Sequence, residues 1–325
     1  MRAPGGFLTL LLPVVLILSG CVTPQPDLPS FPESLLLTDY TTWFAADVEG
    51  NRELLRYVLS ELDSGLIGVV DRTSRIAGGI RAVPGSPAEL SAVVSGAFPK
   101  GLVEWVLGGD DSLERDTAQV AGSERVYFRR AEGTLQLALP ADDYLYVSTG
   151  RVLEMLRDRP PAELEIDPSV YRSLRRVGRV GQTDALLVFH EPGSGFLRSL
   201  GVDARGLPIA RIELSITNRV AADSGTGEAD GGTPDTPAEA IGAPLELGGV
   251  IELRSEQSAA LFGRLGRLFV LVFVRALGLE SAAVQEQAVI TVDGSRVIFA
   301  QIPMQREELV TAIRRITGAE QEVQP

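Results

Sequence analysis

The chain has one cysteine and one histidine among its 325 residues. With Cys21 as the only thiol, no disulfide can form within the chain, so the fold must be held together by its core alone. A single imidazole, His190, removes most hydrolase triads and imidazole metal sites at once. Because His190 ends a predicted strand and has no second candidate ligand nearby, we interpret it as a structural residue.

Aromatic residues and basic charge are also scarce. Only 6% of the chain is aromatic, so the core is expected to consist mainly of aliphatic side chains. Thirty basic and 43 acidic residues give a net charge of −13, which repels phosphates and argues against a nucleic-acid partner. The arginines at 172, 175, 176 and 179 share a helical spacing, and we interpret them as a solvated helix face in preference to a phosphate site.

Motifs that carry chemistry are missing as well. Neither a phosphate-binding loop nor a dinucleotide glycine fingerprint is present. Ser194 lies between two glycines but lacks the outer spacing of a nucleophile elbow, and the adjacent acids at 110–111 and 142–143 lack the alternating ligands of a calcium loop. We therefore predict no catalytic residue, no metal site and no cofactor.

What the chain does have begins at its N-terminus. Arg2 precedes twelve mostly apolar residues at 7–18. This stretch is shorter than the roughly 20 residues of a membrane-spanning helix and is typical of a signal peptide. It ends in Leu18, Ser19, Gly20 and Cys21, and this tetrapeptide resembles the lipobox of bacterial lipoproteins.

That resemblance covers the leader alone, and it implies cleavage after Gly20 and acylation of Cys21. The mature protein would then be exported and anchored to a bilayer of the cell envelope, because several acyl chains on one residue give durable attachment. Val22 follows the cysteine, where an Asp would favour retention in the inner membrane of enteric bacteria. The resemblance thus favours the outer membrane.

The composition divides the chain into segments. The signal peptide at 1–20 is followed by a proline-rich tether at 21–33, a first half at 34–159, a connecting segment with a short helix at 160–182, a second half at 183–318 and a tail at 319–325. Within the second half, residues 221–242 combine Gly, Pro and acidic residues with no base. This composition predicts a disordered loop.

The hydrophobic patterns predict strands alternating with helices. A strand near Trp43 is followed by a helix after Asn51, then by a second helix through Leu66, Val70 and Ile76. Short turns between later strands, among them Asp293-Gly294, require antiparallel pairing. We predict an α+β fold of two similar halves, each a largely antiparallel sheet covered by helices, and the similar order of elements suggests an internal duplication.

The most unusual internal feature is an unbroken apolar run at 268–274, inside a long helix predicted at 256–277. We favour a central helix buried by sheets on two sides. The alternative is the wall of an apolar groove, which would be lined by Leu268, Phe269, Val272 and Phe273.

These features favour a membrane-anchored envelope lipoprotein with a non-enzymatic binding or structural role. Its partners would be the bilayer, through acylated Cys21, and another envelope protein. A carrier or sensor of an apolar ligand such as a lipid is the alternative, and a hydrolase of envelope polymers is the third reading.

Overall fold

The computed structural model describes residues 36, 39–62, 70–81, 89–130, 134–157, 166–178, 184–190, 207–218, 245–276, 278–279 and 288–317. Four of the predicted segments lie outside these residues. They are the signal peptide at 1–20, the tether at 21–33, the acidic loop at 221–242 and the tail at 319–325.

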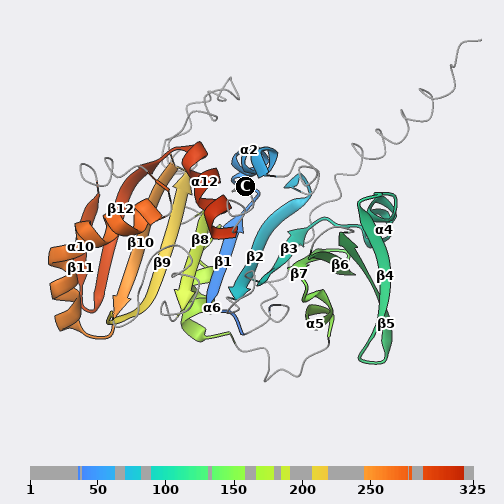
Figure 1. Ribbon diagram of the computed structural model, residues 1–325, viewed down its shortest axis with the longest axis horizontal. Helices are drawn as coiled ribbons and strands as arrows, with labels where there is room; N and C mark the ends of the chain where they lie inside the picture. Colours follow the sequence, from blue (N-terminus) through green and yellow to red (C-terminus); the bar gives the residue numbers. More distant parts are fainter. Residues whose placement is uncertain are drawn as a thin grey trace, which may run out of the picture. The chain divides into compact units, whose positions relative to one another are not determined.

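Twelve described strands form one sheet, and every neighbouring pair in it is antiparallel (Figure 1). The order across the sheet is β11-β12-β10-β9-β8-β1-β2-β3-β7-β6-β5-β4. The strands are β1 Thr42–Asp47, β2 Thr73–Arg81, β3 Glu89–Gly96, β4 Leu113–Val120, β5 Ser123–Arg130, β6 Leu135–Ala141, β7 Tyr144–Thr149, β8 Ala185–His190, β9 Ile209–Asn218, β10 Leu245–Leu253, β11 Val289–Asp293 and β12 Arg296–Met304.

The prediction of two helix-covered halves is wrong, because β1 joins all the strands into a single sheet. On one side β1 pairs with β2, with Phe44 opposite Gly78, and on the other side it pairs with β8, with Phe44 opposite Leu187. Two separate sheets would each leave an edge of unpaired backbone groups at this place. The pairing on both sides of β1 satisfies those groups, so the fold is one sheet-dominated unit.

Two strands were not foreseen from the sequence. The helix predicted through Ile76 is instead strand β2 over Thr73–Arg81, which runs between the partners β1 and β3. Strand β4 was not predicted at all, because half of its side chains are exposed and the strand shows no apolar alternation. Tertiary pairing overrides local pattern in both segments.

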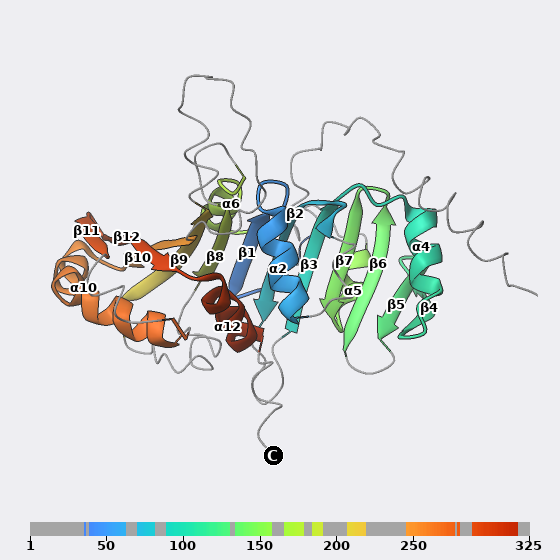
Figure 2. The ribbon, with the colours of Figure 1, turned by 90° about the horizontal axis from the view of Figure 1, so that it is seen from above.

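Helices cover parts of both faces of the sheet. They are α2 Arg52–Leu62, α4 Lys100–Gly108, α5 Val152–Leu156, α6 Pro168–Leu174, α10 Glu256–Ala276 and α12 Arg306–Thr317. Helices α2, α10 and α12 contribute to one core cluster with strands β9, β10 and β12, through residues such as Val58, Val270 and Val310. Helix α6 lies on the opposite side of the sheet from α2 (Figure 2).

Helices α4 and α10 occupy equivalent positions in the chain path. Strand β3 leads into α4, and the strands after it return so that β7 pairs with β3. Strand β10 leads into α10, and the hairpin after it returns so that β12 pairs with β10. Consequently the two helices lie toward opposite ends of the sheet, α4 near β4 and α10 against β11 and β12 (Figure 1).

Candidate binding surface

The titratable side chains of the described residues are the first candidates for a functional site. In the part of the chain that the structure describes, no group of three His, Cys, Asp or Glu side chains could hold a metal ion. His190 ends β8, and its Nδ1 is buried without a hydrogen-bond partner in that same part. Ser194 and the residues next to it lie outside the described ranges.

The most buried carboxylate is engaged by arginines. Glu213, on β9, is 5% exposed, accepts a hydrogen bond of 2.6 Å from Ser173 Oγ and pairs with Arg176 at 2.6 Å and with Arg211. Burial by itself raises the pKa of Glu213, but the Ser173 hydroxyl and the two guanidinium groups outweigh it and lower the pKa. Glu213 is therefore held ionised, which suits a structural ion pair and not a general acid.

The arginines in and just after helix α6 have structural partners too. Arg176 pairs with Glu213, and the Arg175 guanidinium lies 5.6 Å from the centre of the Tyr171 ring. Arg172 Nε donates to the carbonyl of Pro168 within the same helix. Of the predicted helix face, only Arg172 lies within α6; Arg175 and Arg176 follow its end, and Arg176 pairs with a buried carboxylate. Arg179 lies outside the described residues.

Helix α10 contacts the sheet through its small and branched residues. Ala259, Val270 and Val274 are essentially fully buried against β10, β11 and β12. Two glycines on this side bring the helix close, because a Cβ at Gly263 would lie 2.3 Å from Val292 Cγ2 and one at Gly266 would lie 3.1 Å from Ile290 Cγ2. The inner face of α10 is therefore core.

The outer face of α10 carries four exposed aliphatic residues that we call the outer stripe: Leu261 is 59% exposed, Leu265 52%, Leu268 61% and Val272 51%. Nine positions separate Leu261 from Val270, which is about two and a half helical turns, so the stripe points directly away from the sheet. Single exposed aliphatics need no explanation, but a line of them marks an interaction surface.

Two of the four residues proposed from the sequence, Leu268 and Val272, belong to the outer stripe. The other two, Phe269 and Phe273, lie on the same helix, but their side chains fall outside the described set. Leu261 and Leu265 were missed, since the sequence argument used the unbroken run at 268–274. The spacing of 261, 265, 268 and 272 was the signal that would have found them, because it repeats at helical intervals.

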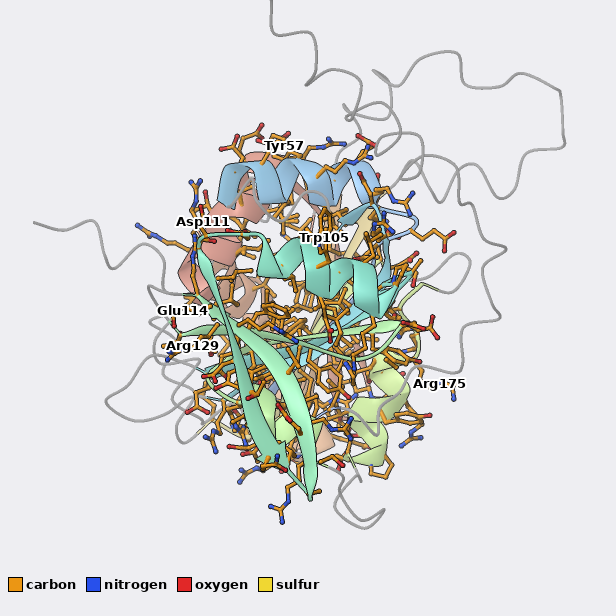
Figure 3. All side chains as sticks on the ribbon, turned by 90° about the vertical axis from the view of Figure 1, so that its right-hand side faces the viewer. Tyr57, Trp105, Asp111, Glu114, Arg129 and Arg175 are labelled. Carbon is orange, nitrogen blue, oxygen red and sulfur yellow. The ribbon has the colours of Figure 1, made fainter. Side chains whose placement is uncertain are left out.

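Helix α4, toward the other end of the sheet, also exposes apolar residues. Trp105 is 72% exposed and points outward in Figure 3, with Val106 exposed beside it. Val103 and Leu107 pack against the core cluster beneath the helix. The exposed apolar set on α4 is shorter than the outer stripe of α10, and α4 itself is nine residues long against 21.

A shallow hollow lies on the sheet where β9, β10 and β12 meet. It measures about 220 Å³, and its lining includes Ser215, Thr217, Glu246, Gly248 and Val250. Ligand pockets are usually about 300–1,000 Å³ and mostly apolar. This hollow is too small to enclose a lipid chain.

None of the helices that the structure describes is both long enough and apolar enough to cross a membrane.

The fold is one long antiparallel sheet of twelve described strands, with helices on both of its faces. Crystal forms I, III and IV of TP0453 are similar, with TM-scores of 0.54, 0.53 and 0.52 and 17% identity in each case. The matches cover 88%, 87% and 87% of this chain and 97%, 98% and 96% of those chains. At this identity the likeness concerns the fold alone. No family model and no curated protein matches the chain.

Proposed function

We propose that this protein is a lipid-anchored, non-enzymatic binding protein of the bacterial cell envelope, and that the outer stripe of α10 is its binding surface. The observation that carries the proposal is a line of four aliphatic side chains, each more than half exposed, on a helix whose opposite face is core. Keeping such a line in water costs free energy, and a partner that covers it recovers that cost.

The leader supports the anchoring part of the proposal. The apolar stretch at 7–18 followed by Leu18, Ser19, Gly20 and Cys21 resembles a lipoprotein signal. An anchor at Cys21 confines the protein to the surface of one membrane. The partner is then another component of the envelope, and the valine at position 22 favours the outer membrane as the site.

The arrangement of polar groups favours binding over catalysis. A catalytic carboxylate is usually desolvated, aimed into a cleft and free to exchange a proton. Glu213 and Asp39 are instead fixed by arginines, and Asp167 accepts hydrogen bonds from the backbone of α6. Burial and the nearby Asp184 raise the pKa of Asp47, but Asp184 accepts hydrogen bonds from Asn51 Nδ2 and from the N–H of Asn218, so this pair belongs to a structural network. The hydrolase reading therefore has less support than binding.

The carrier reading also has less support than surface binding. A carrier of a lipid needs an enclosed apolar cavity, whereas the hollow beside Gly248 is small, is open to solvent and includes Glu246 in its lining. The apolar residues of α10 lie on an outward-facing helix surface, which suits a partner that lies against it.

The anchoring is tested by replacing Cys21. In cells fed a fatty-acid analogue, the parent protein is expected to be labelled, and Cys21→Ser is expected to accumulate as an unlabelled precursor that is not cleaved before position 21. Equal labelling of the two proteins contradicts the lipid anchor.

The binding surface is tested with a photo-reactive amino acid in the full, membrane-bound chain. Placed at position 268 in the outer stripe, it is expected to form adducts upon illumination. The matched control carries it at Gln119, an exposed residue of β4 far along the sheet. Adducts no more frequent at 268 than at 119 would show that the outer stripe binds nothing, while leaving the anchoring intact.

A further inference from the structure

Strand β11 forms one edge of the sheet, with α10 beside it (Figure 1). Among the described strands it pairs with β12 alone. Asp293 lies opposite Arg296 across a two-residue turn, and such a pair is hydrogen-bonded in hairpins of this kind. Because the bonds alternate along the strand, the N–H and C=O groups of Ile290 and Val292 point away from β12, toward the open edge.

The two edges of the sheet differ in their protection against a further strand. Natural edge strands usually carry charges that prevent such an addition. Strand β4, at the other edge, has three charged residues in succession at 114–116. Strand β11 has no charged residue before its last position, and its Val289 and Val292 are each 46% exposed. The β11 edge is therefore the one that can accept another strand.

Helix α10 runs along β11 in the opposite direction. A Cβ at Gly263 would approach Val292, and one at Gly266 would approach Ile290, so the helix numbering rises as the strand numbering falls. The position at Gly266 also lies 3.8 Å from Val297 of β12, whereas the position at Gly263 approaches Val292 alone. The side of the helix that carries Gly263 is thus the side nearer to the open edge.

Two arginines occupy that side of α10. Successive helical residues are about 100° apart, so Arg267 and then Arg264 follow Gly263 around the helix, away from β12. Both arginines are exposed, and neither forms an ion pair within the part of the chain that the structure describes. On the other side of Gly266, Phe262 packs against the core. The two arginines therefore lie beside the open edge, level with the backbone groups that point outward.

We propose that the β11 edge binds an extended acidic segment of another protein, which joins the sheet as an antiparallel strand. This goes beyond the proposed function, because it adds a second binding surface next to the outer stripe. In the added strand, the residues opposite Ile290 and Val292 are two positions apart, and their side chains lie on the face that α10 covers. Acidic side chains there meet Arg264 and Arg267, while the backbone of the same residues bonds to the edge. The recognised pattern is an acid, any residue, and an acid.

Other occupants of this edge fit less well. A second copy pairing through its own β11 would place Ile290 and Val292 where acidic residues fit, and would bring the arginines of two helices together. An anionic lipid surface would attract the arginines, but it would leave the outward N–H and C=O groups without partners, which is costly in an apolar medium. An acidic strand satisfies both the charges and the backbone.

The charge requirement is tested by fluorescence anisotropy with the purified full chain in an uncharged detergent. The probe is a fluorescein-labelled heptapeptide with blocked ends, Thr-Val-Glu-Val-Glu-Val-Thr, and saturable binding is expected. The same peptide with lysine in place of both glutamates is expected not to bind. The double variant Arg264→Gln, Arg267→Gln should bind the glutamate peptide roughly three- to tenfold more weakly, the scale of two exposed ion pairs.

The matched control removes the same charge elsewhere. Arg115, on β4, and Arg157, just after α5, are both exposed, and Arg115→Gln, Arg157→Gln should bind the peptide as the parent does. Circular dichroism checks that both double variants are folded. Equal affinities of the two double variants, or equal binding of the lysine peptide, overturn the proposal.

The backbone requirement is tested by N-methylation of the probe. In the antiparallel strand the N–H of each glutamate points toward β11, whereas the N–H of the central valine points away. An N-methyl group on one glutamate is expected to abolish binding, and one on the central valine is expected to preserve it. Equal binding of the two methylated peptides would mean that charge alone attracts the probe, and the added strand would be wrong.

A last variant separates this site from the outer stripe. Leu265→Gln, Leu268→Gln removes two apolar residues of the stripe and should leave binding of the heptapeptide unchanged. Loss of binding in this variant would place the peptide on the stripe, which overturns the strand addition and leaves the proposed function standing. Conversely, peptide binding at the edge without photo-adducts at position 268 would support the edge site and contradict the outer stripe.

Discussion

Arg151 and Asp39, which are 112 positions apart in the chain, form a bidentate ion pair. Arg151 Nη1 donates to Asp39 Oδ1 at 3.0 Å, and Nη2 donates to Oδ2 at 2.9 Å. The Arg151 side chain is 8% exposed, and its guanidinium also lies 5.7 Å from the centre of the Tyr40 ring. This pair attaches the residues that precede β1 to the start of α5, and so fixes the place where the chain enters the sheet.

Replacing Arg151 with Met is expected to destabilise the protein by about 2 kcal/mol, the scale of hydrogen bonds between charged groups. We expect no larger loss of stability, because the Asp39 side chain is 44% exposed and water partly screens its charge. The matched control is Arg129→Met, which removes a 2.7 Å pair with Glu114 in which both side chains are about half exposed (Figure 3). It should cost under about 1 kcal/mol. Urea unfolding at pH 7 measures both, and equal losses would contradict the structural role of Arg151.

The Arg151 pair also predicts a dependence on pH. Burial by itself raises the pKa of Asp39, but the hydrogen bonds and charge of Arg151 outweigh burial and lower it below the ordinary value of 3.8. A carboxyl with a lowered pKa stabilises the fold above its unfolded value, and this stabilisation is lost as the pH falls through the folded value. The difference between the parent and Arg151→Met should therefore shrink below pH 3.8.

Asp47, near Asp184 at the other end of β1, predicts a pH dependence of stability with the opposite sign. Burial raises the pKa of Asp47, and the Asp184 carboxylate adds to the rise, while the N–H donated by Gly50 opposes it in part. Ionised Asp47 thus destabilises the fold at neutral pH, and stability is regained as the pH falls through its folded pKa. Asp47→Asn should raise Tm at pH 7, and its advantage should vanish in acid.

Asp184 serves as the matched control for Asp47. Its Oδ1 accepts from Asn51 Nδ2 at 2.9 Å and its Oδ2 accepts from the backbone N–H of Asn218 at 2.6 Å. Asp184→Ala leaves both donors without this acceptor and is expected to cost about 1–3 kcal/mol. Thermal unfolding followed by circular dichroism distinguishes the two variants. A lower Tm for Asp47→Asn at pH 7 would mean that its bond to Gly50 outweighs the cost of its buried charge.

Elements with a local chemical signal could be predicted from the sequence. Asp167 before Pro168 predicted a capped helix, and Asp167 does accept from the N–H groups of Ser169 and Val170. The strands of the Asp293 hairpin pair as expected, with Asp293 opposite Arg296. In both cases the residues that determine the structure lie within a few positions of one another.

Pairings between distant segments could not be predicted in this way. The contact of β1 with β8 joins residues more than a hundred positions apart, and the sequence of neither strand identifies the strand with which it pairs. The apolar run at 268–274 had the same limit, since a helix covered on one side and a helix covered on two sides can share a composition. The structure separates them by placing Val270 in the core and Leu268 in water.

Glycines in the sheet and in helix α4 should respond oppositely to alanine. A Cβ at Gly78 would lie 2.2 Å from the carbonyl oxygen of Ser91 and 2.9 Å from Ala92 Cα, so Gly78→Ala forces β2 and β3 apart at a cost of about 1–3 kcal/mol. Gly101 has no heavy atom within 4 Å of that position, and Gly101→Ala should add up to about 1 kcal/mol of helix stability. Chemical denaturation checks both, and tolerance of Gly78→Ala would contradict the close strand approach.

Two neighbouring valines of α10 offer the sharpest test of which face is core. Val270 is 1% exposed among β10, β11 and β12, whereas Val272, two positions on, is 51% exposed in the outer stripe. Val270→Asp buries an unpaired carboxylate at a cost of several kcal/mol, a large part of a typical stability of 5–15 kcal/mol, and should unfold the protein or raise the pKa of the new carboxyl strongly. Val272→Asp places the same charge in water and should leave the circular dichroism spectrum and Tm close to those of the parent. If Val272→Asp unfolds the chain as Val270→Asp does, the helix is covered on both sides, and the outer stripe cannot be a binding surface.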